Sequence, residues 1–248
     1  MSEILHKTNI KIRNVLLLNE LDKIDRILSR ENIEAMVIKG SSMILKNVFK
    51  LNEREMSDID IFVKQNDFKK FENILYKSGF KKIERGYNSY YKEIGGYFAP
   101  VIFDIHYDFI GIKFDDIETE NTEYKNIKAS SLIDDFIITS IHSVIRHGYL
   151  SKKDLEDLFR VYREGVKKYS DFINRVIKKS EKFGFGYIVY LCFKKIGVNL
   201  EKPSLKFREF FSIPFVKISV LRHIRLNEYI LPLFYDKELV KNKIKRFV

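Results

Sequence analysis

Two hydrophobic periods alternate along the first part of the chain. Between residues 8 and 30, apolar side chains recur at spacings of three, four and seven, which predicts an amphipathic helix. Its apolar stripe consists of Ile10, Leu17, Leu21, Ile24 and Leu28. The period then shortens, and residues 33–39 (IEAMVIK) and 56–63 (MSDIDIFV) are typical of strands. Between them, SSMILKNVF is typical of a helix that starts directly after Gly40.

The same mixture of periods continues to about residue 128. NDFKKFENILYKSGF predicts a helix that begins near Asn66 or Asp67 and stops at Gly79. FKKIER, YNSYYKE and VIFDIHYDF predict strands, with a turn at Gly95 and Gly96. We therefore expect an α+β fold. In it, residues 1–128 form a small mixed β-sheet flanked by helices, with the helix over 8–30 packed on it.

From residue 129 onward the pattern becomes helical. Two capping boxes predict helix starts, one from Ser131 to Asp134 and one from Ser151 to Asp154. The expected helix ends are Gly148, Gly165 and Gly184. The sequence thus predicts a helical C-terminal domain over residues 129–248.

The composition favours a globular protein without membrane insertion. Apolar residues make up 45% of the 248 residues, which argues against disorder. No apolar run approaches the roughly 18 residues of a membrane span, and the first residues lack the apolar stretch of a signal peptide. The single cysteine, Cys192, lies in a helix-like segment and is expected in the core. A cytoplasmic location is the expectation that follows.

Positive charge is concentrated in the C-terminal part of the chain. The net charge is +11, and residues 151–248 contain 23 Lys and Arg against 11 Asp and Glu, whereas residues 1–150 contain 22 against 23. Such an excess suits a polyanionic partner such as RNA. Solvated helix faces in a lysine-rich protein are the plainer explanation.

Two aspartates interrupt the apolar strand MSDIDIFV. Side chains alternate along a strand, so Asp58 and Asp60 share one face, about 6.6 Å apart at a rise of roughly 3.3 Å per residue. Two carboxylates this close repel each other unless a cation compensates them. Mg²⁺ prefers oxygen ligands and suits this pair.

A third carboxylate interrupts the later strand VIFDIHYDF. Asp104 and His106 lie on one face of that strand, and Asp108 lies on the same face nearer its end. If the two strands are neighbours, Asp104 completes a carboxylate cluster and can accept the proton of an attacking hydroxyl as a general base.

The segment KGSS predicts the phosphate side of the same site. Gly40 allows a ligand to approach the backbone closely, and Ser41 opens a helix whose free N–H groups favour an anion. Lys39 precedes the glycine, and Arg54 stands four residues before Asp58, where it is suited to clamp a triphosphate.

In this order the segments KGSSMIL, REMSDIDIFV and FDIHYDF resemble the nucleotidyltransferase superfamily, which has the DNA polymerase beta-like fold. The likeness is greatest to a poorly characterised bacterial and archaeal group with a KG turn followed by R-x-M-S-D-I-D, and it covers roughly residues 30–165. The gap from Ser41 to Asp58 is longer than in the commonest form of the superfamily, which leaves the role of Ser41 open.

The resemblance implies transfer of a nucleoside monophosphate from an NTP, such as ATP, to an acceptor hydroxyl, with release of pyrophosphate. Two Mg²⁺ ions, or Mn²⁺ in their place, would be held by three acids: Asp58, Asp60 and Asp104. The nucleotide would be bound by six further residues: Lys39, Gly40, Ser41, Arg54, Ser57 and His106.

The acceptor stays open at this level. A small molecule or protein is one alternative, and a toxin-like enzyme acting on tRNA or other RNA is another. A catalytically silent nucleotide-binding protein is a third, although the presence of all three acids argues against it. In the helical part, His147 and Asp157 match a second motif of the group and are candidates for substrate contact, while His142 is expected to be structural.

Overall fold

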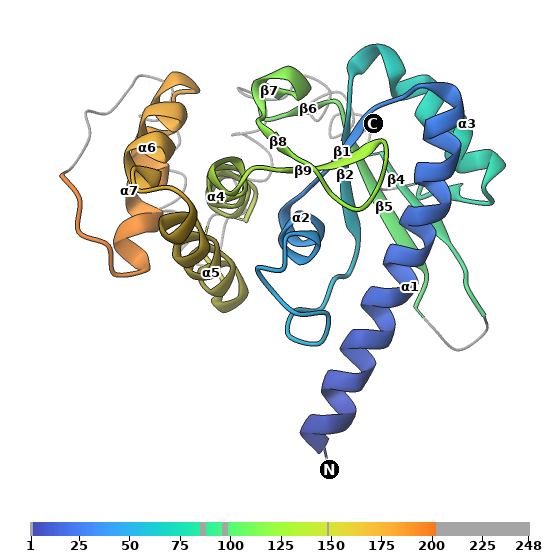
Figure 1. Ribbon diagram of the computed structural model, residues 1–248, viewed down its shortest axis with the longest axis horizontal. Coiled ribbons are helices and arrows are strands. Elements are labelled where there is room, and N and C mark those ends of the chain that lie inside the picture. Colours follow the sequence, from blue (N-terminus) through green and yellow to red (C-terminus); the bar gives the residue numbers. More distant parts are fainter. Residues whose placement is uncertain (1, 85–87, 96–98, 148, 202–248) are drawn as a thin grey trace, which may run out of the picture. The chain divides into compact units, whose positions relative to one another are not determined.

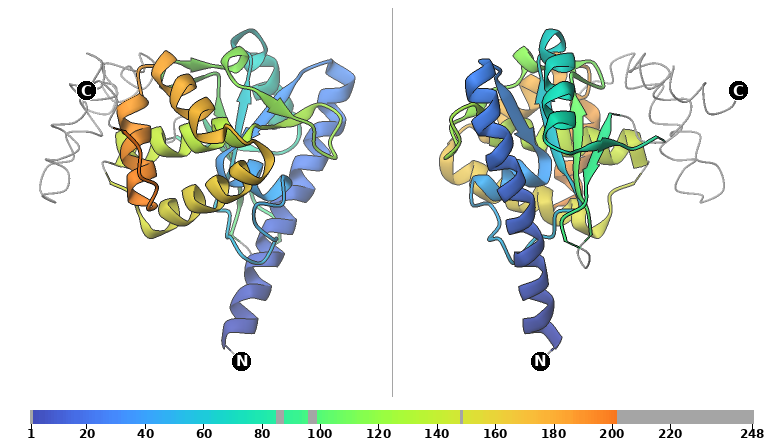
Figure 2. Two further views of the ribbon diagram at one scale, coloured as in Figure 1. Left: turned by 60° about the vertical axis from the view of Figure 1, so that its left-hand side comes forward. Right: turned by 90° about the vertical axis from the view of Figure 1, so that its right-hand side faces the viewer.

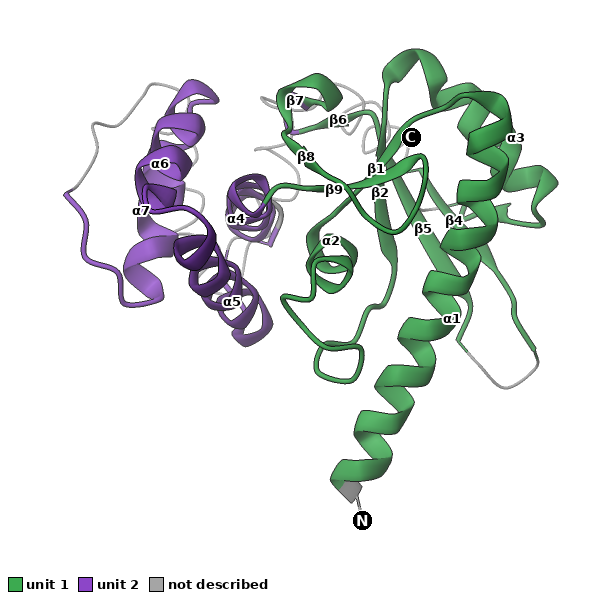
Figure 3. Cartoon of the chain, in the orientation of Figure 1, with its two compact units in different colours: residues 1–109, 113–131 green, residues 110–112, 132–248 purple. Residues whose placement is uncertain are grey.

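The computed structural model describes residues 2–84, 88–95, 99–147 and 149–201. These residues form an α+β fold, as the sequence predicts, whose elements are labelled in Figure 1. The chain divides into two compact units, coloured separately in Figure 3. Unit 1 comprises residues 1–109 and 113–131, and unit 2 comprises residues 110–112 and 132–248.

Unit 1 is built on a seven-stranded mixed sheet with the strand order β3-β4-β5-β2-β1-β9-β8. Its strands are β1 (Ala35–Ile38), β2 (Ile59–Val63), β3 (Lys81–Lys82), β4 (Ser89–Lys92), β5 (Val101–His106), β8 (Thr119–Glu120) and β9 (Ile127–Ser130). At the centre, β2 is parallel to β5 and antiparallel to β1, which is parallel to β9. A separate two-stranded ribbon contains β6 (Asp108–Phe109) and β7 (Ile112–Lys113).

Three α-helices pack on this sheet. They are α1 (Ser2–Glu31), α2 (Lys39–Leu45) and α3 (Phe68–Lys77), and two 3₁₀ turns, η1 (Gln65–Asp67) and η2 (Phe114–Asp116), connect other elements. The helix α1 contacts α3 and β5, while α2 contacts β1, β2 and β9. The five residues of the predicted α1 stripe are at most 7% exposed. The helix is longer than predicted: residues 3–9 are exposed, and Figure 2 shows this end of α1 extending beyond the sheet.

The chain passes from β1 into α2 without the glycine turn that the sequence suggests. The strand ends at Ile38 and the helix already begins at Lys39, so Gly40 lies within the helix. Lys39 makes this change of direction itself, with a left-handed φ of 57°. Expecting the helix to start after Gly40 was therefore wrong, because the residue before the glycine takes the conformation that the turn requires.

Apart from residues 110–112, unit 2 is helical in its described part. It contains α4 (Leu132–Ile141), the π-helical turn η3 (His142–His147), α5 (Lys152–Lys168), α6 (Phe172–Lys182) and α7 (Gly186–Lys195). Its core includes Phe136 stacked on Phe193 with ring centroids 4.2 Å apart. The predicted capping box of α5 is confirmed, because the Ser151 hydroxyl accepts from the Asp154 N–H and the Asp154 carboxylate accepts from the Ser151 N–H.

The predicted helix ends are confirmed in part. Gly184 follows α6 with φ of 79°, but Gly165 lies inside α5, so its prediction as a helix end was wrong. A Cβ built on Gly165 would lie 2.4 Å from the ring of Phe172, so the glycine is there for close packing. Gly148 and residues 202–248 lie outside the described residues.

Two further expectations concern membranes and the cysteine. Among the described residues, no helix combines the length and apolar character needed to cross a membrane. Cys192 is a buried free thiol, and burial raises its pKa to about 12. It is therefore a core residue, as predicted, and an unreactive one.

Candidate active site

Two of the three predicted acids lie side by side at the centre of the sheet. The parallel strands β2 and β5 pair Asp60 with Asp104. Residues paired in this way point their side chains to the same face of a sheet. The two strands are therefore neighbours, which is the condition for Asp104 to join the carboxylate cluster.

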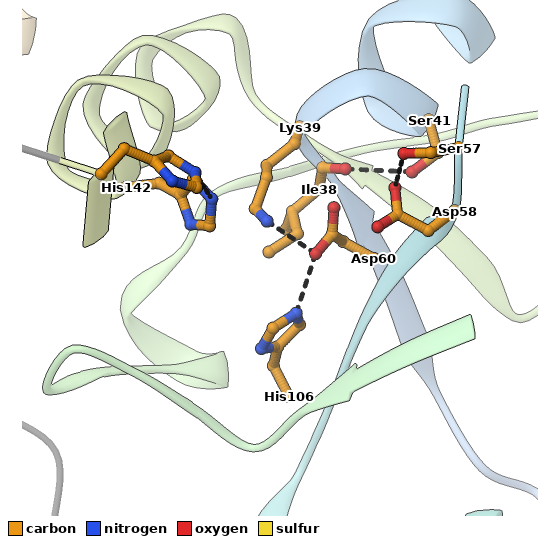
Figure 4. Close-up of polar contacts among 9 residues, drawn as sticks. Ile38, Lys39, Ser41, Ser57, Asp58, Asp60, His106 and His142 are labelled. Atoms are coloured by element: carbon orange, nitrogen blue, oxygen red, sulfur yellow. Dashed lines mark hydrogen bonds and ion pairs between the residues drawn. The ribbon is translucent and has the colours of Figure 1, made fainter. Parts of the chain in front are cut away.

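Asp60 is buried between two nitrogen-bearing side chains. Figure 4 shows its carboxylate between Lys39 and His106. Its Oδ1 accepts a hydrogen bond from Lys39 Nζ at 2.7 Å and lies 2.9 Å from Nε2 of His106. Burial by itself would raise the pKa of Asp60, but the Lys39 ammonium and the His106 imidazole outweigh it and hold that pKa well below its usual range. Asp60 is consequently a carboxylate at neutral pH.

Asp104 has the opposite electrostatic environment. Burial is the main cause that raises its pKa, and the neighbouring charge of Asp60 adds to it, while a hydrogen bond with Ser89 on β4 opposes it. Its Oδ1 is buried and has no hydrogen-bond partner among the described residues. Of two adjacent carboxylates, one is therefore compensated by Lys39 and His106, and the other retains an oxygen that lacks a partner.

Asp58 lies one residue before β2 rather than inside it, so expecting it within the strand was wrong. It is half-exposed, and its Oδ1 accepts a hydrogen bond of 2.9 Å from the Ser57 hydroxyl (Figure 4). No ladder pairing of β2 with β5 extends to this position, since the register begins with Ile59 and Phe103. Asp58 is thus placed by the loop before β2 and not by the pairing of β2 with β5.

The predicted phosphate-binding segment forms the first turn of α2. The Ser41 hydroxyl donates to the Ile38 carbonyl at 3.0 Å (Figure 4), and Ser41 is 2% exposed. Gly40 allows a close approach, as expected, but the group that approaches is a side chain of this chain. A Cβ on Gly40 would lie 1.9 Å from Nη1 of Arg54. Arg54 and Lys39 thereby bring two positive charges to the point where β1 ends and α2 begins.

Asp60 and Asp104 have the chemistry of a Mg²⁺ site that a substrate would complete. The described residues include no group of three or more His, Cys, Asp or Glu side chains arranged to hold a metal ion unaided. Mg²⁺ does not need such a cage, because it commonly binds one or two carboxylates together with substrate phosphates and water. A hard cation would bind the Asp104 oxygen that lacks a partner among the described residues and would be attracted by the ionised Asp60 beside it.

The remaining candidates belong to unit 2. His142 and His147 both lie in η3, with their Nε2 atoms 3.1 Å apart. Asp157 lies on α5 and is 4% exposed. The expectation that His147 and Asp157 contact substrate stays a prediction.

Sequence reasoning missed Ser89 and the pairing of Lys39 with Asp60. Ser89 lies in register with Asp104 on the antiparallel strand β4. The serine in YNSYYKE points to a role beside Asp104 only when the order of the strands is known. Lys39 was assigned to phosphate, but the structure places its ammonium on an acid of the site.

Comparisons with known proteins bear on the family of the chain. A search of curated proteins found no match. The model of a family described as uncharacterised nucleotidyltransferase matches residues 6–196, which include the whole seven-stranded sheet and α4 to α7. With this match over most of its length, the chain belongs to that nucleotidyltransferase family.

Proposed function

We propose that the protein transfers a nucleoside monophosphate from an NTP to an acceptor hydroxyl in a metal-dependent reaction that releases pyrophosphate. One observation carries the proposal: Asp60 and Asp104 lie side by side, and a buried oxygen of Asp104 lacks a partner among the described residues. Membership of a nucleotidyltransferase family supports the same reaction class.

Asp58, Asp60 and Asp104 are the residues that would hold two Mg²⁺ ions, or Mn²⁺. When bound, such ions neutralise the charge of the triphosphate and of the leaving pyrophosphate. Asp60 suits this role because it is ionised at neutral pH. Asp58 suits it because it is half-exposed at the start of β2.

Asp104 is also the proposed general base. Its raised pKa makes its carboxylate a better proton acceptor than an ordinary aspartate. It would take the proton of the acceptor hydroxyl as the oxygen attacks the α-phosphorus and the bond to pyrophosphate breaks. Ser89, which hydrogen-bonds Asp104, orients the carboxylate for this task.

The cationic side chains Lys39 and Arg54 would bind the phosphates, together with Ser57 and His106. Gly40 would admit the Arg54 guanidinium to this side of the site, and the buried Ser41 would hold the turn through the Ile38 carbonyl. Lys39 is 17% exposed in its side chain, and its ammonium lies 2.7 Å from Asp60, where it would also neutralise the charge of a bound triphosphate. Charge neutralisation and alignment of this kind supply most of the catalysis in phosphoryl transfer.

Incubation with each of the four NTPs, labelled at the α-phosphate, tests the reaction. Wild type should transfer label to an acceptor pool only when Mg²⁺ is present, and Asp60→Asn should transfer none above background. Transfer that needs no metal, or that survives in Asp60→Asn, would contradict the proposal.

The acceptor pools separate the two enzyme alternatives. We propose a small molecule or protein as the acceptor, and a pool of tRNA tests the alternative. Label on tRNA, with binding that weakens steeply as salt rises, would favour RNA. Metal-dependent NTP binding without transfer to any pool would indicate a silent binding protein.

A further inference from the structure

One side chain of α1 binds three backbone carbonyls at the end of the sheet where β2 and β5 begin. Arg13 donates from Nη1 to the carbonyl of Ala99 at 2.5 Å. It donates from Nη2 to the carbonyls of Pro100 at 2.6 Å and Ser57 at 3.0 Å. The guanidinium therefore joins the segment that enters β2 to the segment that enters β5.

These two segments lead directly to acids of the proposed metal site. The Ser57 carbonyl belongs to the peptide bond that leads into Asp58, and Pro100 directly precedes β5, which carries Asp104. The sheet fixes Asp60 against Asp104 through its register, but Asp58 lies outside that register. Arg13 supplies for Asp58 the backbone restraint that a ladder would otherwise give.

The next residue of α1 restrains the loop before Asp58 in the same manner. Asn14 is fully buried, and its Nδ2 donates to the carbonyls of Leu51 at 2.8 Å and Arg54 at 2.7 Å. Its Oδ1 accepts from the Met56 N–H at 3.0 Å. Asn14 thereby fixes the backbone of Arg54, whose guanidinium packs on Gly40.

A third polar residue of α1 shows what a purely structural restraint looks like. Asp25 accepts hydrogen bonds from the N–H groups of Lys125, Asn126 and Ile127 at 2.8–3.0 Å. It holds the segment that enters β9, which carries none of the candidate site residues. Asp25 and Arg13 lie on the same helix and each binds three backbone groups, so the two can be compared directly.

We infer that Arg13 is a positioning residue of the nucleotidyltransferase site, which sets Asp58 relative to Asp104 and so determines the affinity for the metal. The inference rests on the proposed metal-dependent function. It assigns to α1 a role in the reaction, although the sequence predicts for that helix only packing on the sheet. Residues that orient metal ligands typically change metal affinity by about 10- to 100-fold when they are replaced.

Titration of the full-length chain with Mn²⁺ in the presence of a saturating non-hydrolysable nucleoside triphosphate, with protein-bound Mn²⁺ followed by electron paramagnetic resonance, tests this. Arg13→Gln should raise the Kd for Mn²⁺ about tenfold or more, and Arg13→Lys, which retains the charge, should recover part of the loss. Hydrogen exchange should become faster in residues 56–59 and 99–102 of Arg13→Gln.

Asp25→Asn is the matched control. It should lower thermal stability and leave the Kd for Mn²⁺ within about twofold of wild type, because it does not touch the site. A Kd in Arg13→Gln equal to that of wild type, or an equal rise in Asp25→Asn, would overturn the inference. Absence of Mn²⁺ binding in wild type would overturn the proposed function along with it. Binding that Asp58→Ala abolishes but Arg13→Gln retains would overturn the inference alone.

Discussion

Lys39 combines an unusual backbone conformation with a central contact. A left-handed φ of 57° is uncommon for a residue with a Cβ, and such conformations gather at functional sites. The conformation lets the chain enter α2 directly and directs the ammonium to Asp60. The sequence placed Lys39 at the site, but a φ value is not readable from a lysine, so its partner was not foreseen.

Asp104→Asn should stabilise the protein while it abolishes activity. In the metal-free protein the charge of Asp104 is disfavoured by burial and by Asp60, and an amide removes both costs. We expect the free energy of unfolding at pH 7 to rise by about 1 kcal/mol. Nucleotidyl transfer should fall at least about 100-fold with the loss of the base.

The pH dependence and a control variant check the cause. A raised pKa means that the charge costs stability above the pKa of folded Asp104, so the gain in Asp104→Asn should shrink as the pH falls toward 4. Asp108→Asn, on the neighbouring β6, should keep activity within about twofold of wild type. Chemical denaturation and the transfer assay measure both, and a destabilised Asp104→Asn would contradict this account.

At the scale of elements, the sequence predicted the helices and strands better than their ends. The stripe of α1 and the alternation in β5 are set by burial of one face, so periodicity reveals them. Ends depend on single contacts: Gly165 resembles a helix end because only the fold shows that Phe172 packs against it. The adjacency of Asp60 and Asp104 likewise depends on strand order, which no local pattern specifies.

Gly165→Ala should destabilise the protein by about 1–2 kcal/mol. A methyl group would meet the Phe172 ring at 2.4 Å, and that ring is 1% exposed and cannot move freely. Overpacking of this kind costs about 1–3 kcal/mol. The better helix propensity of alanine offsets somewhat less than about 1 kcal/mol of that cost. Thermal unfolding followed by circular dichroism measures the change.

Gly40→Ala provides the contrasting case. The atoms that its methyl would meet are the mobile end of Arg54, so we expect a stability within about 1 kcal/mol of wild type. Equal destabilisation in both alanine variants would show that the two glycines have the same structural role.

At the scale of the whole molecule, buried carboxylates with lowered pKa values determine the response to acid. Burial raises the pKa of Glu72, but hydrogen bonds from Tyr90, Lys69 and Lys82 outweigh it and lower the pKa to about 2. The pKa of Asp60 is lowered as well. Such groups contribute stability above the unfolded pKa and lose it as the pH falls through the folded pKa.

The free energy of unfolding should therefore fall between about pH 4.5 and pH 2 as Glu72 takes up its proton. Glu72→Gln should remove about 2 kcal/mol of stability at pH 7 and flatten this acid limb. Urea denaturation at a series of pH values measures the effect. An acid limb of unchanged slope in Glu72→Gln would exclude Glu72 as its cause.

The charge of the whole chain was readable from the sequence, but its use was not. The excess of Lys and Arg lies in residues 151–248, and a solvated surface explains it without an RNA partner. Composition records how much charge there is, whereas recognition depends on where the side chains stand.

The most direct test of the metal-dependent site is a crystal structure with Mn²⁺ and a non-hydrolysable nucleoside triphosphate, with anomalous diffraction recorded at the manganese edge. The account predicts an anomalous peak bound to carboxylate oxygens of Asp60 and of Asp58 or Asp104, with triphosphate oxygens completing the coordination. A nucleotide bound elsewhere, or no peak at these carboxylates, would contradict it.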